Sequence, residues 1–83
     1  MIVSLHNFCG SKYLINTDNI NYVHICPADT KTYAEEIAES GGGPLSFIYI
    51  NWHCESSCTR ILVSSEIAEE FITNVFNNVI ELF

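Results

Sequence analysis

The residues of this 83-residue chain that could bind a metal ion are histidines and cysteines in two stretches. His24 and Cys26 are separated by one residue, so their side chains share one face of a β-strand. Cys54 and Cys58 flank a predicted turn between two later strands. If these regions meet, the four side chains could form a tetrahedral zinc site. Neither spacing is that of the familiar cysteine pair in zinc sites, so the alternative is that Cys26 is a small core side chain and His24 lies at the surface.

The same cysteines could support covalent chemistry. A disulfide between Cys54 and Cys58 would cross the turn, but the chain starts without a signal peptide, and an intracellular compartment favours reduced thiols. A nucleophilic cysteine needs a nearby base. His53 precedes Cys54, yet neighbours on an extended strand point to opposite faces. A domain of this size also leaves little volume for a substrate cleft. We therefore expect no catalytic residue, no cofactor and no enzymatic activity.

Glutamates gather in two segments that have helical patterns. They are Glu35, Glu36 and Glu39 in the shorter segment, and Glu66, Glu69 and Glu70 in the longer one. One interpretation is a pair of solvated helix faces, with Glu66 and Glu69 placed favourably near a helix start. The other is a negative surface that is complementary to a basic protein surface, since such surfaces guide association and exclude wrong partners. A compact acidic protein could then occupy a nucleic-acid-binding groove in place of the phosphates.

The composition excludes several classes of protein. The chain has 3 Lys+Arg against 10 Asp+Glu, a net charge of -7, and 48% hydrophobic residues, which argues against disorder. Three basic side chains neutralise few phosphates, so we expect no direct nucleic-acid binding, although Phe47, Tyr49 and Trp52 could stack on bases. No apolar run reaches the roughly 18 residues of a membrane span. We expect a soluble cytoplasmic protein without membrane contact, located in the host cytoplasm if it is phage-encoded.

Hydrophobic periodicity predicts a single α+β domain over residues 1–83. The prediction is an antiparallel sheet of about five strands in the order β-β-β-α-β-β-α, with a long C-terminal helix packed on it. The predicted strands cover residues 1–7, 12–16, 20–26, 45–52 and 59–63, and the fourth is apolar on both faces, as a central strand would be. Gly10 suits a left-handed turn. Thr32 with Glu35 forms a capping box for the first helix, and Ser64 or Ser65 caps the second.

The second predicted helix, which runs to about Leu82, has an unusually wide apolar face. At the helical period its apolar residues sweep about 220°, whereas packing on one sheet needs only about 100°. One explanation is that the sheet curls around this helix or that the helix end frays. The other is that the part of the apolar face that does not pack on the sheet faces another subunit or a partner. Small domains are marginally stable alone, so we favour a homo-oligomer, with a dimer first. The predicted self-association residues are Phe71, Val75, Phe76, Val79, Ile80, Phe83 and Trp52.

Two segments of the chain resemble the small flagellar FlbD family. The likeness covers residues 1–25 and 59–80 and is carried by Met1-Ile2, Leu5, Asn7, Gly10, Tyr13-Leu14-Ile15-Asn16, Asn19-Ile20, Val23, Thr59-Arg60-Ile61-Leu62-Val63 and the helix from Ser65 to Ile80. These motifs are structural: a hairpin glycine, an asparagine corner and a strand-to-helix cap. The resemblance implies an opening hairpin and a closing strand and helix. The chain departs from the family in its insertion from Pro27 to Gly43, its acidity and its cysteines.

Four functional hypotheses follow. The first is a non-enzymatic, acidic protein-binding module, in its specific form a phage-type inhibitor of a basic, nucleic-acid-handling protein, similar in size and charge to anti-CRISPR and other DNA-mimicking proteins. The second is a structural or regulatory oligomeric subunit, as the flagellar resemblance implies. The third is a zinc-stabilised interaction domain. A sink for small nucleotides ranks last, because it would need a positive pocket. The net charge favours the first hypothesis.

Overall fold

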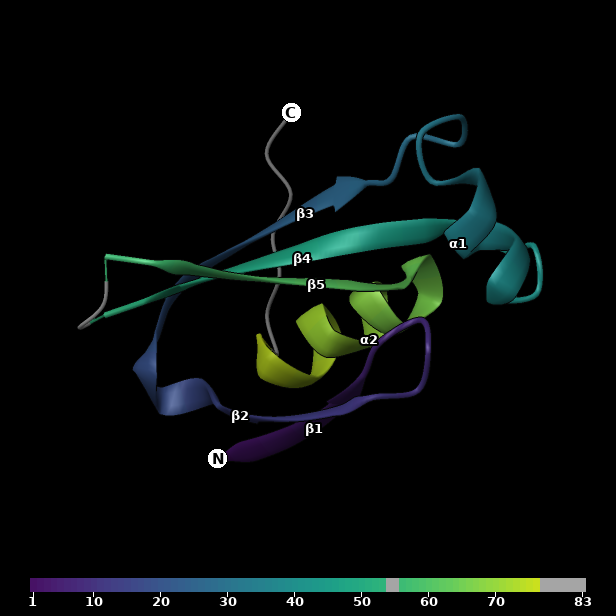
Figure 1. Ribbon diagram of the computed structural model, residues 1–83. Helices are drawn as coiled ribbons and strands as arrows, with labels where there is room; N and C mark the ends of the chain where they lie inside the picture. Colours follow the sequence, from purple (N-terminus) through teal and green to yellow (C-terminus); the bar gives the residue numbers. More distant parts are fainter. Residues whose placement is uncertain (54–55, 77–83) are drawn as a thin grey trace.

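The computed structural model describes residues 1–53 and 56–76 (Figure 1). Its elements follow the predicted order: β1 (Ile2–His6), β2 (Lys12–Asn16), β3 (Ile20–Pro27), α1 (Ala34–Glu39), β4 (Leu45–Trp52), β5 (Cys58–Ser64) and α2 (Ser65–Val75), with a 3-10 turn, η1 (Thr17–Asn19), between β2 and β3. The α+β prediction is confirmed. None of the helices in these two ranges is long and apolar enough to span a membrane.

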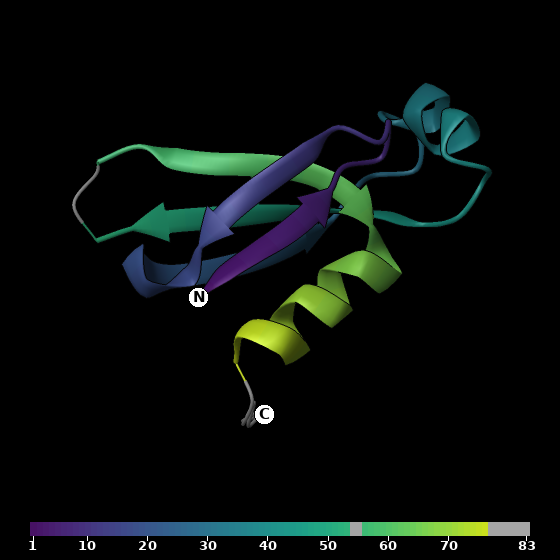
Figure 2. The ribbon, with the colours of Figure 1, turned by 90° about the horizontal axis from the view of Figure 1, so that it is seen from below.

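The five antiparallel strands form two sheets rather than the single sheet we expected. β1 and β2 form a hairpin, and β3, β4 and β5 form a second sheet with β4 in the centre. The hairpin lies across one face of this second sheet (Figures 1 and 2). At η1 the Asn16 side chain accepts a hydrogen bond from the backbone N–H of Asp18, and the chain changes direction there. As a result β3 passes into the other layer instead of pairing with β2.

β4 is the central strand of the fold, as its sequence predicts. Its residues are buried on both faces, and Ile48 and Ile50 are 0% exposed. Strand alternation places these two isoleucines on the face toward the hairpin, which we call the inner face. Phe47 and Tyr49 point to the opposite, outer face. The cross-strand partners of Ile48 are apolar on both sides, so the inner face is continuous across the sheet.

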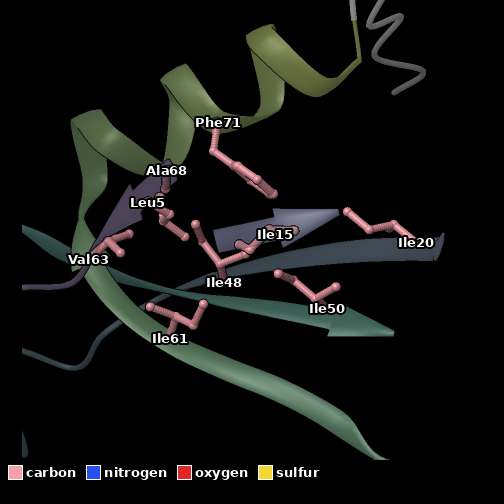
Figure 3. Close-up of a cluster of buried hydrophobic side chains, with 9 residues drawn as sticks. All are labelled: Leu5, Ile15, Ile20, Ile48, Ile50, Ile61, Val63, Ala68 and Phe71. Atoms are coloured by element: carbon pink, nitrogen blue, oxygen red, sulfur yellow. The ribbon is translucent and has the colours of Figure 1, made fainter. Parts of the chain in front are cut away.

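The core lies between the hairpin and the inner face of the three-stranded sheet, and α2 closes it along one side (Figure 3). Its buried members come from both sheets and from α2: Leu5, Ile15, Ile20, Ile48, Ile50, Ile61, Val63, Ala68 and Phe71. α2 supplies the last two of these and packs against β4 and β5. The helix therefore joins the two sheets through apolar contacts, since no strand pairing connects them.

The ends of α2 are set by backbone hydrogen bonds. The Ser64 side chain accepts a hydrogen bond of 3.2 Å from the backbone N–H of Ile67, so Ser64 is the cap, whereas the Ser65 hydroxyl is hydrogen-bonded to that of Ser46 at 2.7 Å. The helix ends at Val75, and Phe76 has an extended backbone (φ -120°, ψ 91°). The prediction that the helix continues to Leu82 is wrong for Phe76, and residues 77–82 lie outside the described part.

The predicted capping box of α1 is wrong. The Thr32 hydroxyl donates to the Asp29 carboxylate at 2.6 Å, and the backbone N–H of Thr32 donates to the same oxygen at 3.0 Å. Tyr33 occupies the cap position without a side-chain hydrogen bond. The Thr32 hydroxyl, followed by its backbone N–H, lowers the pKa of the Asp29 carboxyl. Asp29 therefore takes the hydroxyl that the capping box would need.

At the hairpin turn, Gly10 has the expected positive φ of 88°.

Candidate functional site

α1 carries the first group of predicted acidic residues. Glu35 and Glu36 lie in its first turn, and Glu39 is its last residue. Glu39 neighbours both others on the helix surface, because residues three and four apart share one side. Glu35 and Glu39 are exposed, and Glu36 is half-buried. We call these three residues the α1 surface. The one ion pair found in residues 1–53 and 56–76 joins the Met1 ammonium to Asp18, so no described cation neutralises the α1 surface.

α2 carries the second acidic group. Glu66, Glu69 and Glu70 are all exposed, while Ala68 and Phe71 of the same helix face the core. We call these three glutamates the α2 surface. Glu66 lies in the first turn, where the helix dipole stabilises an anion. The predicted single acidic face thus consists of two surfaces on separate helices, with α1 beside the start of β4 and α2 along one side of the core, next to the hairpin (Figures 1 and 2).

The outer face of the three-stranded sheet carries an aromatic cluster that includes Phe47 and Tyr49, two of the three aromatic residues that could stack on bases, but its other members were not predicted. The strand register places Tyr49 between His24 and Arg60. The His24 and Tyr49 rings stack with centroids 5.6 Å apart, and the Arg60 guanidinium lies 4.9 Å from the centre of the Phe47 ring. Tyr33 packs edge-on against Phe47 at 5.0 Å. Phe47 lies at the centre of the cluster and is only 7% exposed, because the surrounding side chains cover its ring.

The predicted zinc ligands do not converge. His24 and Cys26 share the outer face of β3, as expected, and pair with Tyr49 and Phe47 of β4. Cys58 lies on β5, two strands away, which corresponds to roughly 9–10 Å at the usual strand spacing. Within the described ranges no three His, Cys, Asp or Glu side chains lie close enough to hold a metal ion. Cys54 lies outside those ranges.

The predicted self-association residues occupy different environments. Phe71 is 2% exposed and belongs to the core of its own chain, so it is not available at the surface. Val75 and Trp52 are half-buried and pack against that core, and the Trp52 indole N–H donates to the Thr59 hydroxyl at 2.9 Å. The remaining members are Phe76, which is 38% exposed, and Val79, Ile80 and Phe83, which lie outside the described residues.

The outer face of the β1–β2 hairpin carries exposed apolar side chains that the predictions did not include. Met1, Ile2 and Leu14 are 60%, 63% and 71% exposed. Ile2 and Leu14 lie on this outer face, and we call these two residues the hairpin patch. Met1 precedes β1, and its ammonium pairs with the Asp18 carboxylate. Strand alternation places Ile2 and Leu5 on opposite faces, and Leu5 is the buried one. The same alternation could not show that nothing in the described chain covers Ile2, because it contains no information on how the two layers stack.

Comparisons with protein-family models, with curated proteins and with solved structures found no match to this chain. The resemblance to the flagellar FlbD family therefore stays a prediction. Any functional assignment therefore rests on the chemistry of the described residues.

Proposed function

We propose that this protein is a non-enzymatic protein-binding module whose α1 surface binds a basic surface on another protein. The observation that carries this proposal is the position of Glu39. An anion at the last residue of a helix meets the negative end of the helix dipole, and α1 has no basic residue in its last turn. Glu35, four residues earlier, adds like-charge repulsion. The Glu39 carboxylate therefore does not stabilise the folded state. It would stabilise a complex with a basic partner.

The charge balance of the chain supports the same proposal. The formal net charge is -7, and the Arg60 guanidinium lies over an aromatic ring rather than beside a carboxylate. Uncompensated carboxylates raise the association rate with positive surfaces and disfavour negative ones. Basic grooves are typical of proteins that handle nucleic acids. In its specific form, the proposal is an inhibitor of the phage type that occupies such a groove in place of DNA.

The test compares two variants with the same change in charge. Proteins captured from a bacterial lysate by the immobilised wild type at low salt are identified, and the affinity of the purified partner is measured by calorimetry. The variant Glu35→Lys/Glu36→Lys/Glu39→Lys should reduce the affinity at least about 100-fold, because close charge pairs at interfaces contribute several kcal/mol. The control Glu66→Lys/Glu69→Lys/Glu70→Lys changes the net charge equally but leaves the α1 surface intact, so its loss should be much smaller.

Salt and DNA provide the second half of the test. Binding through the α1 surface should weaken steeply as salt rises, because exposed charges are screened. Duplex DNA should displace the protein from a partner whose groove it occupies. A complex that is unaffected by salt, or equal losses in the two triple variants, would contradict the proposal. Persistence of the complex in excess DNA would contradict the inhibitor form alone.

A further inference from the structure

β3 is an edge strand of the three-stranded sheet, and its outer edge is open. β4 lies in the centre of this sheet, so β3 and β5 form its two edges (Figure 1). The edge of β5 is occupied, because the backbone N–H of Phe8 in the hairpin turn donates to the Leu62 carbonyl at 2.9 Å. In the part of the chain that the structure describes, no strand or turn pairs in this way with β3 at Val23 or Ile25.

The backbone groups that face this open edge belong to Val23 and Ile25. The pairing of β3 with β4 continues past Pro27, where the Ala28 N–H donates to the Leu45 carbonyl at 3.0 Å. In an antiparallel ladder every second residue bonds to the same neighbouring strand. Counting back from Ala28, the residues that bond to β4 are Cys26, His24 and Tyr22. Val23 and Ile25 alternate with them, so their N–H and C=O groups point away from the sheet.

The edge of β3 lacks the features with which proteins protect a sheet edge. Charged side chains, prolines, bulges and covering elements are the usual ones. β3 has eight residues and no charge, whereas β2 and β5 carry Lys12 and Arg60. β1 is also uncharged, but it is shorter, and α2 lies beside it (Figure 2). β3 is protected only at its ends, by the register shift between Ile20 and Tyr22 and by Pro27, so the segment between them is open to pairing with another strand.

From these observations we infer that β3 of a second copy of this chain pairs antiparallel with β3 and joins the two three-stranded sheets. A two-fold axis beside His24 places Val23 of each copy opposite Ile25 of the other. Every outward N–H and C=O group of these two residues then has a partner. A shift of two residues would place Val23 opposite Pro27, which has no N–H, or Ile25 opposite Asn21, which the register skips. The open segment is therefore complementary to itself in one register.

This arrangement also keeps the α1 surfaces of the two copies apart. α1 lies beside the start of β4, which pairs with the end of β3 (Figure 1). Antiparallel pairing puts the ends of the two β3 strands on opposite sides of the contact. Eight residues of β3 span about 26 Å at the usual rise per residue, whereas the screening length at physiological salt is about 8 Å. The α1 surfaces of two copies with a net charge of -7 each therefore repel one another little.

The first measurement is sedimentation equilibrium at physiological salt on the wild type, His24→Lys and Leu14→Lys. In the inferred dimer the two copies of residue 24 face each other. Like charges directly opposite on neighbouring strands are unfavourable, so we expect a wild-type dimer and a dissociation constant about fivefold higher for His24→Lys. Leu14→Lys makes the same change in charge on the hairpin patch, at a side chain that is 71% exposed, and should not weaken the dimer. Circular dichroism checks that both variants are folded.

Amide hydrogen exchange in the wild type shows where the contact lies and needs no variant. The Val23 and Ile25 amides should exchange at least about 10-fold more slowly in a concentrated, dimeric sample than in a dilute, monomeric one, because only the dimer bonds them. The His24 and Cys26 amides are internal controls. They bond to β4 within one chain, so their exchange should slow far less.

Three results would overturn this inference. They are a wild type that stays monomeric at the highest soluble concentration, a dimer whose Val23 and Ile25 amides exchange as fast as in the monomer, and equal weakening by His24→Lys and Leu14→Lys. The inference does not rest on the proposed function, because α1 contributes no residue to the edge of β3. The variant Glu35→Lys/Glu36→Lys/Glu39→Lys should lose the basic partner but still dimerise, so the failure of one proposal is distinguishable from that of the other.

Discussion

The carboxylates of α1 differ in their effect on the helix that carries them. Glu35 and Glu36 lie in the first turn, where an anion is favourable, and Glu39 lies in the last, where it is not. Residue counting could predict that this segment is acidic. It could not separate the stabilising from the destabilising positions, because those depend on where the helix begins and ends. The predicted cap at Thr32 was wrong because its hydroxyl donates to the Asp29 carboxylate, a contact that the capping-box pattern does not take into account.

Replacing Glu39 should therefore stabilise the protein. We expect Glu39→Gln to raise the free energy of unfolding by about 0.5 kcal/mol, because it removes an anion from the helix end and its repulsion with Glu35. In a domain of this size the melting temperature should rise by about 2–4 °C. Thermal unfolding followed by circular dichroism at low salt measures this. The gain should shrink at high salt, and an unchanged or lower melting temperature at low salt would contradict the prediction.

A second residue-scale prediction concerns Asp29. The hydrogen bond from the Thr32 hydroxyl, followed by that from the Thr32 N–H, lowers the pKa of the Asp29 carboxyl below its ordinary value of 3.8. A carboxyl whose pKa is lower in the folded state stabilises it above the unfolded pKa, and this contribution is lost as the pH falls through the folded pKa. An NMR titration should give the Asp29 carboxyl a pKa below 3.8 in the wild type and a pKa closer to 3.8 in Thr32→Val. Titration at the same pH in both proteins would contradict it.

At the scale of elements, most of the fold could be predicted. The limits of β2 and β4 agree with the prediction, β3 differs by one residue at one end, and β1 and β5 differ by one residue at each end, because alternation and turn residues are local signals. Pairing is not local: alternation shows which residues share a face but not which strands adjoin. The division into two sheets therefore could not be predicted. The predicted end of α2 was wrong, because the apolar periodicity of the sequence continues past Val75 whereas the helix ends there.

The cap of α2 gives an element-scale prediction. Ser64→Ala removes the acceptor for the Ile67 N–H and should lower the free energy of unfolding by about 1 kcal/mol. Ser64→Asp keeps an acceptor at the same position and should retain most of the stability. Urea denaturation measures both variants. Equal losses in the two proteins would show that the acceptor at position 64 does not determine the stability of this helix.

At the scale of the whole molecule, acidic residues outnumber basic ones by 10 to 3. The described ion pair, between Met1 and Asp18, is exposed, and such pairs contribute little. Repulsion among the carboxylates thus outweighs attraction and opposes the compact state. The sequence alone predicted this excess charge. The sequence also shows that β1 and β2 carry no acidic residue, because the first one in the chain is Asp18.

Moderate salt should therefore stabilise the fold. We expect the melting temperature to rise as sodium chloride increases to about 0.3 M, a range in which screening of charge repulsion dominates. The variant Glu66→Lys/Glu69→Lys/Glu70→Lys changes the charge by +6, from -7 to -1, and should show a much smaller rise. Differential scanning calorimetry at matched protein concentration measures both. A wild-type melting temperature that falls with salt would contradict this view of the charge.

The separation of the hairpin from the main sheet also matters while the chain is being synthesised. The hydrogen-bonded ladder of β1 and β2 lies within residues 2–16, so it can form once these residues have emerged from the ribosome, before the rest of the chain. The side chains that cover Leu5 and Ile15 come from β4, β5 and α2, and α2 ends at Val75. At about 5–20 residues per second, synthesis of the chain from Asn16 to Val75 takes roughly 3–12 seconds. During it the nascent hairpin exposes apolar side chains on both faces, which makes it a ready substrate for ribosome-associated chaperones.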